Sequence, residues 1–288
     1  MQSVILGCGD IGRRIVKSLI AQGDQADNII GFVKSAKSVE QCAELGVIAL
    51  RLDLDDITRN LSACDGTQLY YTIAPQKQGT QDKRTKSLLE QFDANSIKPQ
   101  KVVLISTTGV YGDCQGEWVS EVNETNPQTE RGQRRLDSER QWLSWGKQNS
   151  VPVVVLRVPG IYANSRLPRK RIAARTPVVN PDECGFTNRI HADDLADMCI
   201  AAMQKGHAGE VFNATDGTPG KISEYLQEAA KTLGVEPLPE ISLSEAESQL
   251  SSGMMSYLNE SRKISNKKIL AHLDVNLRYP DFREGIKY

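Results

Sequence analysis

Short apolar runs rich in Val, Ile and Leu alternate with amphipathic segments through the first half of the chain. Such runs are typical of strands that are buried on both faces of a parallel sheet. Six of them are expected to form strands, at residues 3–6, 29–33, 47–50, 69–73, 102–106 and 153–158. The amphipathic segments between them predict parallel βαβ units. We therefore expect an α/β fold of the Rossmann type, with a doubly wound parallel sheet.

The amphipathic segments are expected to be helices that pack on this sheet. Ile11, Ile15 and Leu19 recur at helical spacing and predict the first helix. A similar apolar stripe predicts another helix near residues 133–147. Both segments carry charged residues between the apolar ones, so their outer faces are expected to meet water.

The second half of the chain has a different character. After Ile161 the apolar pattern is irregular and is interrupted by prolines, which predicts a smaller lobe packed over the sheet. A helix is expected in this lobe at residues 223–233, and the serine-rich residues 242–253 are expected to form a mobile surface segment. The resulting division gives a nucleotide-binding domain of residues 1–162 plus 189–214 and a C-terminal substrate-binding lobe of residues 163–188 plus 215–288.

Composition excludes several classes of function. The chain has 35 Lys and Arg against 36 Asp and Glu, so no net field favours nucleic acid or an anionic membrane. Its 6 cysteines form no C-x-x-C pair, which argues against a metal site and favours reduced thiols in the cytoplasm. Strand residues follow Met1 directly and no long apolar run occurs, so neither export nor a membrane span is expected.

A glycine-rich turn lies between the first strand and the first helix. It reads Gly7-Cys8-Gly9-Asp10-Ile11-Gly12 and matches G-x-G-x-x-G in the context that a dinucleotide site requires. Gly7 permits the tight turn, Gly9 lets backbone amides approach a pyrophosphate, and Gly12 allows close packing of helix on strand. A purely structural turn is the alternative, but the position favours a nicotinamide cofactor.

The residues that follow the second strand bear on the choice between NAD and NADP. An NAD site usually has Asp or Glu there, about 20 residues past the turn, to bind the ribose 2′-hydroxyl. This chain has Lys34 and Ser35 instead, with Arg13 and Lys37 nearby, and these cations suit a 2′-phosphate. We therefore expect NADP rather than NAD. The alternative is that Lys34 is a solvated loop residue.

Further segments extend this picture along nearly the whole chain. They lie at residues 52–55, 73–75, 105–112, 156–162, 189–196 and 279–286. Together with the glycine-rich turn they resemble the extended short-chain dehydrogenases, the NAD(P)-dependent epimerase/dehydratase family, which acts largely on sugar nucleotides. The resemblance implies that the remaining cofactor contacts come from Asp53, Leu54, Ile73, Ala74, Pro75, Ser106, Arg135 and Pro159.

The acid–base motif of that family is missing. Family members use the Tyr of a Y-x-x-x-K motif, whose pKa is lowered by the Lys four residues on. Here Arg131 and Arg135 occupy the two positions, and no Tyr occurs between Gly112 and Val158. Arginine keeps its proton at ordinary pH, so Arg131 cannot act as acid and base in turn. This departure resembles the atypical, YeeZ-like branch of the family.

Other residues are candidates for the site. The resemblance implies that Arg135 donates to the nicotinamide ribose and that Thr107 keeps the hydroxyl that orients the substrate. Tyr111 and Tyr162 lie at strand ends, where a replacement acid would have to be, although a structural role in the pocket wall is expected for both, and more so for Tyr162. His191 is expected to be structural.

A basic cluster at residues 166–175 is the candidate for substrate binding. Arg166 and Arg169 in this cluster could hold a diphosphate or carboxylate, or the cluster could be a solvated basic face. Two functions remain open. One is an NADP-dependent oxidoreductase or epimerase acting on a small or sugar-nucleotide-like, anionic substrate. The other is a non-catalytic NADP-binding sensor or interaction protein. The resemblance is also compatible with a homodimer.

Overall fold

Residues 2–288 are described by a computed structural model, in which one central sheet has seven strands. The strands are β1 (Ser3–Leu6), β2 (Ile29–Val33), β3 (Ile48–Arg51), β4 (Gln68–Tyr71), β5 (Lys101–Thr107), β7 (Val153–Val158) and β12 (Val211–Asn213). Their order is β12-β7-β5-β4-β1-β2-β3, and every neighbouring pair is parallel. The chain winds outward in both directions from β1 and β4. The expected Rossmann-type sheet is therefore confirmed.

The prediction of six strands was one short. The additional strand, β12, has only three residues and pairs with β7 at the edge of the sheet. A run of three residues is too short to show the periodicity from which strands are recognised in a sequence. Its pairing with β7 nevertheless places residues 211–213 in the central sheet.

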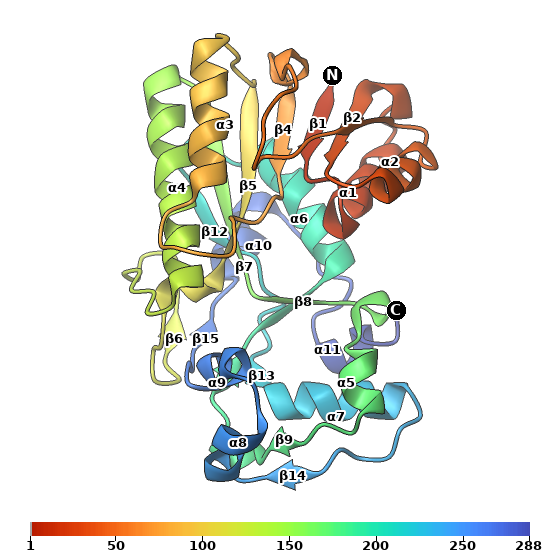
Figure 1. The fold of residues 1–288 in the computed structure, drawn as a ribbon, viewed down its shortest axis with the longest axis vertical. Coiled ribbons are helices and arrows are strands. Elements are labelled where there is room, and N and C mark those ends of the chain that lie inside the picture. The colour runs from red at the N-terminus through yellow and green to blue at the C-terminus, as the bar shows by residue number, and fades with distance from the viewer. Residues whose placement is uncertain (1) are drawn as a thin grey trace.

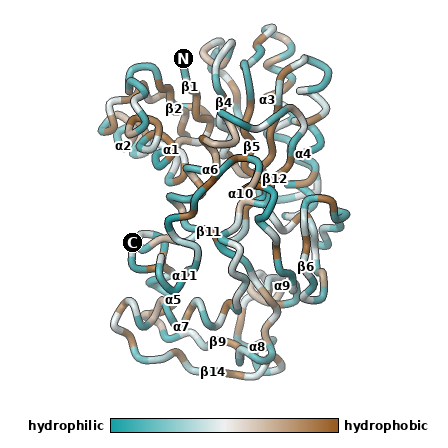
Figure 2. Tube along the Cα trace, turned by 180° about the vertical axis from the view of Figure 1, so that it is seen from behind, coloured by the Kyte–Doolittle hydropathy of each residue, from teal (hydrophilic) through white to brown (hydrophobic). Residues whose placement is uncertain are grey.

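Helices cover both faces of the sheet (Figure 1). One face carries α1 (Asp10–Ala21), α2 (Ala36–Ala43), α6 (Ala192–Lys205) and α10 (Lys267–Leu273), and the other carries α3 (Lys83–Ala94) and α4 (Glu130–Asn149). Ile15 and Leu19 are buried in the first of these layers, as their spacing predicts. Figure 2 shows the apolar segments gathered along the strands between the two layers.

The predicted helix near residues 133–147 is α4, and it is longer than expected. It begins after Thr129, whose Oγ1 accepts a hydrogen bond of 3.1 Å from the backbone amide of Gly132. Such a cap satisfies one of the free amides in the first helical turn. Trp142 then packs on Tyr71 of β4, with ring centroids 5.2 Å apart. The cap therefore places the first turn of α4, including Arg131, at the end of the sheet.

The C-terminal lobe is built from short elements around α7 (Ile222–Thr232), and it lies below the sheet in Figure 1. Its other helices are α5 (Arg169–Ala173), α8 (Leu243–Gln249), α9 (Ser252–Leu258) and α11 (Phe282–Gly285). Four two-stranded pairs lie in this lobe or between it and the rest of the chain. They are β8 (Gly160–Tyr162) with β11 (Arg189–His191), β9 (Val178–Val179) with β14 (Glu240–Ile241), β10 (Phe186–Thr187) with β13 (Gly220–Lys221), and β15 (Lys263–Ile264) with β6 (Trp118–Val119).

The serine-rich segment 242–253, for which the sequence predicts a mobile surface segment, is helical for much of its length. Ser242 and Ser251 cap α8 and α9, each accepting a hydrogen bond from a backbone amide three residues on. Serine is unfavourable inside a helix but favourable at its N-terminus, which is where these two serines stand. The two helices pack around Ala246 and Leu258.

Three features of the described residues concern the membrane, metal ions and the cysteines. No helix within residues 2–288 is long and apolar enough to span a membrane. In the same part of the chain, no group of three or more His, Cys, Asp or Glu side chains is arranged to hold a metal ion. All six cysteines are free thiols.

Candidate functional site

The glycine-rich turn has the geometry that its pattern predicts. Gly7 has φ +96°, and a Cβ on it would lie 2.7 Å from side-chain atoms of Thr72 and Ile73. A Cβ on Gly12 would lie 2.9 Å from the carbonyl oxygen of Gly7. On Gly9 it would meet only that oxygen, at 3.8 Å, and would otherwise fill open space. The turn therefore offers the free backbone that a pyrophosphate needs to approach the start of α1.

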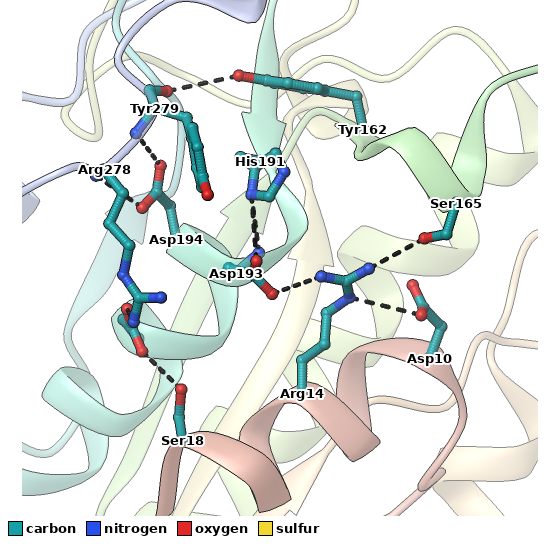
Figure 3. Close-up of polar contacts among 11 residues, drawn as sticks. Asp10, Arg14, Ser18, Tyr162, Ser165, His191, Asp193, Asp194, Arg278 and Tyr279 are labelled. Atoms are coloured by element: carbon teal, nitrogen blue, oxygen red, sulfur yellow. Dashed lines mark hydrogen bonds and ion pairs between the residues drawn. The ribbon is translucent and has the colours of Figure 1, made fainter. Parts of the chain in front are cut away.

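Charged side chains tie this turn to α6 and to the lobe (Figure 3). Arg14 forms an ion pair with Asp193, and its Nη2 donates to Ser165 Oγ at 3.0 Å. Arg166 pairs with Asp10 at 2.6 Å. Burial alone would raise the pKa of Asp10, but Arg166 and Arg14 hold it below its usual value. Asp10 is therefore an ionised carboxylate at the N-terminal end of α1, and two arginines offset its charge.

His191 lies beside these contacts in a structural position, as expected. Its side chain is buried, and its Nδ1 accepts a hydrogen bond of 3.2 Å from the backbone amide of Asp193, which caps α6. The ring packs on Tyr279 with centroids 4.0 Å apart (Figure 3). Burial lowers the pKa of His191, so the neutral ring is favoured at neutral pH.

A groove of about 560 Å³ runs from the glycine-rich turn over the ends of β2 and β3. Its lining includes Gly7, Gly9, Lys34, Ser35, Asp53 and Arg84. The groove thus contains most of the residues expected to hold the adenosine half of a dinucleotide, and Leu54 and Ile73 also line it.

Lys34 is not isolated in this groove. Its Nζ lies 2.9 Å from an oxygen of Asp53 and 3.1 Å from one of Asp55. Arg84 binds both oxygens of Asp55 at 2.6 Å and donates to the carbonyl of Ala74 at 2.9 Å. The Arg84 guanidinium holds the pKa of Asp55 well below its usual range. Two carboxylates that sequence reasoning did not place beside Lys34 therefore offset part of its charge.

A second cavity, of about 290 Å³, lies at the ends of β5 and β7. Thr107, Arg131, Arg135 and Pro159 line it, as their predicted roles require. The opposite wall comes from the end of α9, through Tyr257, and from the chain between α9 and β15, through Glu260 and Arg262. Nothing in the sequence pointed to this wall, because residues 257–262 match no motif and lie about a hundred positions or more from the strands that they face.

Arg135 stands between the groove and the cavity. Its Nη1 donates to the carbonyl of Ile105 at 3.0 Å and reaches that of Ile73 at 3.5 Å. Ile73 lines the groove, whereas Ile105 lines the cavity. Burial lowers the pKa of Arg135, but an arginine stays protonated at neutral pH. Arg135, which is half-buried, therefore contacts one residue from the lining of each hollow.

Tyr111 lies outside the cavity and belongs to a buried network. Its hydroxyl donates to Asn213 at 2.8 Å and accepts from Arg157 at 3.0 Å. Arg157 in turn pairs with Glu139 at 2.9 Å, and Ser106 donates to Glu139 at 2.5 Å. Burial raises the pKa of Tyr111, which makes its proton harder to release. The structure therefore places Tyr111 as a support beneath the cavity, and not as its acid.

The expected clamp of basic residues does not assemble. Arg166 turns to Asp10, and Arg169 donates to Asn164 at 2.9 Å. Arg171 and Arg175 donate to the carbonyls of Pro177 and Pro237. Because each guanidinium binds a different part of the fold, these residues point apart, and Arg166 and Arg169 do not line the cavity. The cations that line it are Arg131, Arg135 and Arg262.

Comparisons with known proteins show what the chain as a whole is similar to. The family described as NAD(P)H-binding matches residues 7–206. Protein YeeZ of Escherichia coli (strain K12) is 25% identical over 287 residues, covering 96% of each chain. A conserved protein of unknown function from Silicibacter pomeroyi has a similar structure, with a TM-score of 0.80 and 27% identity, over 99% of this chain and 96% of that one.

One solved structure with a bound cofactor has the same fold. The UDP-glucuronic acid 4-epimerase of Bacillus cereus in complex with NAD aligns with a TM-score of 0.77 and 20% identity, over 100% of this chain and 96% of that one. At this identity the likeness shows the fold alone.

Proposed function

The chain belongs to the NAD(P)H-binding family, and on that premise we propose that it is an NADP-dependent oxidoreductase or epimerase for a small substrate. Its fold is that of the epimerases and dehydratases. The observation that carries the proposal is the junction at Arg135, which contacts both the cofactor groove and a separate cavity. A nicotinamide bound there would supply or accept a hydride. The six free thiols support a cytoplasmic location.

The residues of the groove fit a dinucleotide. Gly9 leaves room for a pyrophosphate at the start of α1, where free backbone amides favour negative charge. Lys34 and Ser35 stand at the end of β2, where the ribose 2′ position is recognised in this fold. Pro159 and Arg135 are at the other end, beside the cavity. These residues would hold the cofactor along the carboxyl ends of the strands.

The first test is binding followed by turnover. NADPH binding is measured by the change in its fluorescence, and its oxidation is then followed with pyruvate, glyoxylate and glyceraldehyde as carbonyl probes. We expect binding, and oxidation with at least one probe. Binding without oxidation of NADPH by any of them would contradict the proposed reaction.

Lys34 is expected to favour NADPH over NADH. Replacing it with glutamine should weaken NADPH binding by about 10-fold or more, because a charge-assisted contact to the 2′-phosphate is lost. NADH binding should change little. The measurement is fluorescence titration of both cofactors, with Lys147→Gln, an exposed lysine in the last turn of α4, as the matched control. Similar affinities of the unmodified protein for the two cofactors would contradict the choice of NADP.

Tyr257 is proposed as the group that holds the proton in place of the missing Tyr. Tyr257 lines the cavity, and a Cβ on Gly160, on the opposite side of it, would lie 4.0 Å from the Tyr257 hydroxyl. Unlike the guanidinium of Arg131, a phenol can release a proton and recover it.

Tyr257→Phe should lower the rate of NADPH oxidation by about 10²–10⁴-fold and remove one limb of its pH profile. NADPH binding should be unchanged, because the groove is untouched. Tyr288→Phe at the exposed C-terminus is the control. An unchanged rate and pH profile in Tyr257→Phe would exclude this role.

A further inference from the structure

The cavity has an excess of positive charge. Arg131, Arg135 and Arg262 line it, and Glu260 is the carboxylate that lines it with them. Arg131 and Arg135 are four residues apart on α4, a spacing at which like charges repel each other. Arg131 is exposed, and within residues 2–288 no carboxylate lies in ion-pair distance of it. A negatively charged ligand would relieve this repulsion.

Arg262 is held in place by only part of its guanidinium group. The residue is 8% exposed, and its Nη1 donates to the carbonyl of Gly112 at 2.5 Å and to Glu260 at 2.7 Å. Its Nε and Nη2 donate to no residue within the described part of the chain. The backbone of Arg262 is fixed as well, because its amide donates to the carbonyl of Phe186 at 3.2 Å. This arrangement sets two free guanidinium donors on a rigid wall.

We propose that the cavity binds a small organic oxyanion, a carboxylate or a phosphate, between Arg131 and Arg262. The planar guanidinium fork matches the geometry of either group, which it binds with paired hydrogen bonds. Arg135 adds positive charge from the cofactor side. The volume of about 290 Å³ suits a small molecule. This inference rests on the proposed function, in which the same cavity receives the substrate, and it names the chemical class of that substrate.

The test measures anion binding by calorimetry in protein saturated with NADP, so that the glycine-rich turn is occupied. The probes are malonate, inorganic phosphate and the neutral malonamide. Malonate or phosphate should bind and malonamide should not, and whichever anion binds more tightly identifies the preferred group. Arg131→Gln should weaken that binding about 10-fold or more. Arg140→Gln, an exposed arginine on the same helix, should leave it unchanged.

The two proposals fail in different ways. If NADP does not bind, the proposed function is contradicted. The anions are then titrated into the cofactor-free protein, where weaker binding by Arg131→Gln shows that they bind in the cavity and not at the glycine-rich turn. If NADP binds but neither anion does, or if malonamide binds equally well, the oxyanion site is overturned. Binding that survives Arg131→Gln unchanged would overturn it too. If NADPH is oxidised with glyceraldehyde but with neither of the anionic probes, the oxidoreductase proposal stands and the oxyanion proposal is contradicted.

Discussion

Gly9→Ala is expected to abolish useful cofactor binding while the protein remains folded. A Cβ at this position would meet only the carbonyl oxygen of Gly7, at 3.8 Å, so the protein itself accommodates it. The same methyl group would occupy the space through which a pyrophosphate reaches the backbone amides. Loss of two such charge-assisted hydrogen bonds corresponds to about 3 kcal/mol or more, which is roughly 100-fold in affinity. Fluorescence titration with NADPH measures it.

Two further glycine variants make this result specific. Gly253→Ala adds a methyl group where nothing lies within 4 Å and should bind NADPH normally. Gly12→Ala should also lower the melting temperature, because its Cβ would lie 2.9 Å from the Gly7 oxygen and 3.0 Å from Ile5. If Gly9→Ala bound NADPH as well as the unmodified protein, the turn would not be the pyrophosphate site.

Glu139→Ala is expected to cause the largest loss of stability. Glu139 and Arg157 form an ion pair at 2.9 Å with side chains 2% and 8% exposed. Removing the carboxylate leaves a buried guanidinium without its counter-charge, which typically costs about 3–5 kcal/mol. Ser106 would also lose its acceptor at the base of the cavity. The free energy of unfolding in urea measures the effect, which should appear as a lower midpoint.

Two comparisons separate the unpaired charge from the loss of side-chain volume. Glu139→Leu combined with Arg157→Met removes both charges and should be less destabilising than Glu139→Ala, because no buried charge is left alone. Glu90→Ala, whose exposed pair with Lys86 spans 3.9 Å, should change stability little. A double variant less stable than Glu139→Ala would show that the network contributes more than the pairing of its charges.

The cofactor half of the site could be predicted from the sequence because its determinants are local. Gly7, Gly9 and Gly12 are required by a turn, a close approach and a packing contact within six consecutive residues. Continuous apolar runs predict the strands on either side, because each run is long enough to be recognised. Lys34 follows its strand directly, so its place at the groove was also readable, although its carboxylate partners Asp53 and Asp55 were not.

The substrate half depended on contacts between distant parts of the chain. Arg166 and Arg169 looked like a clamp because they are close in sequence, yet Arg166 is drawn to Asp10 across more than 150 positions. Tyr111 stands at a strand end as expected, but its hydroxyl is hydrogen-bonded to the buried Arg157 and Asn213.

The sequence by itself determined the parallel sheet, the glycine-rich turn and the absence of the usual Tyr and Lys, since each depends on neighbouring residues or on a simple periodicity. Only the tertiary structure decided that Arg131 and Arg135 share a cavity with Tyr257 and Arg262. The physical reason is that a short irregular segment carries no periodicity of its own. Its position is set by what it packs against, as when the amide and carbonyl of Arg262 bind Phe186 and Asn188 of another part of the lobe.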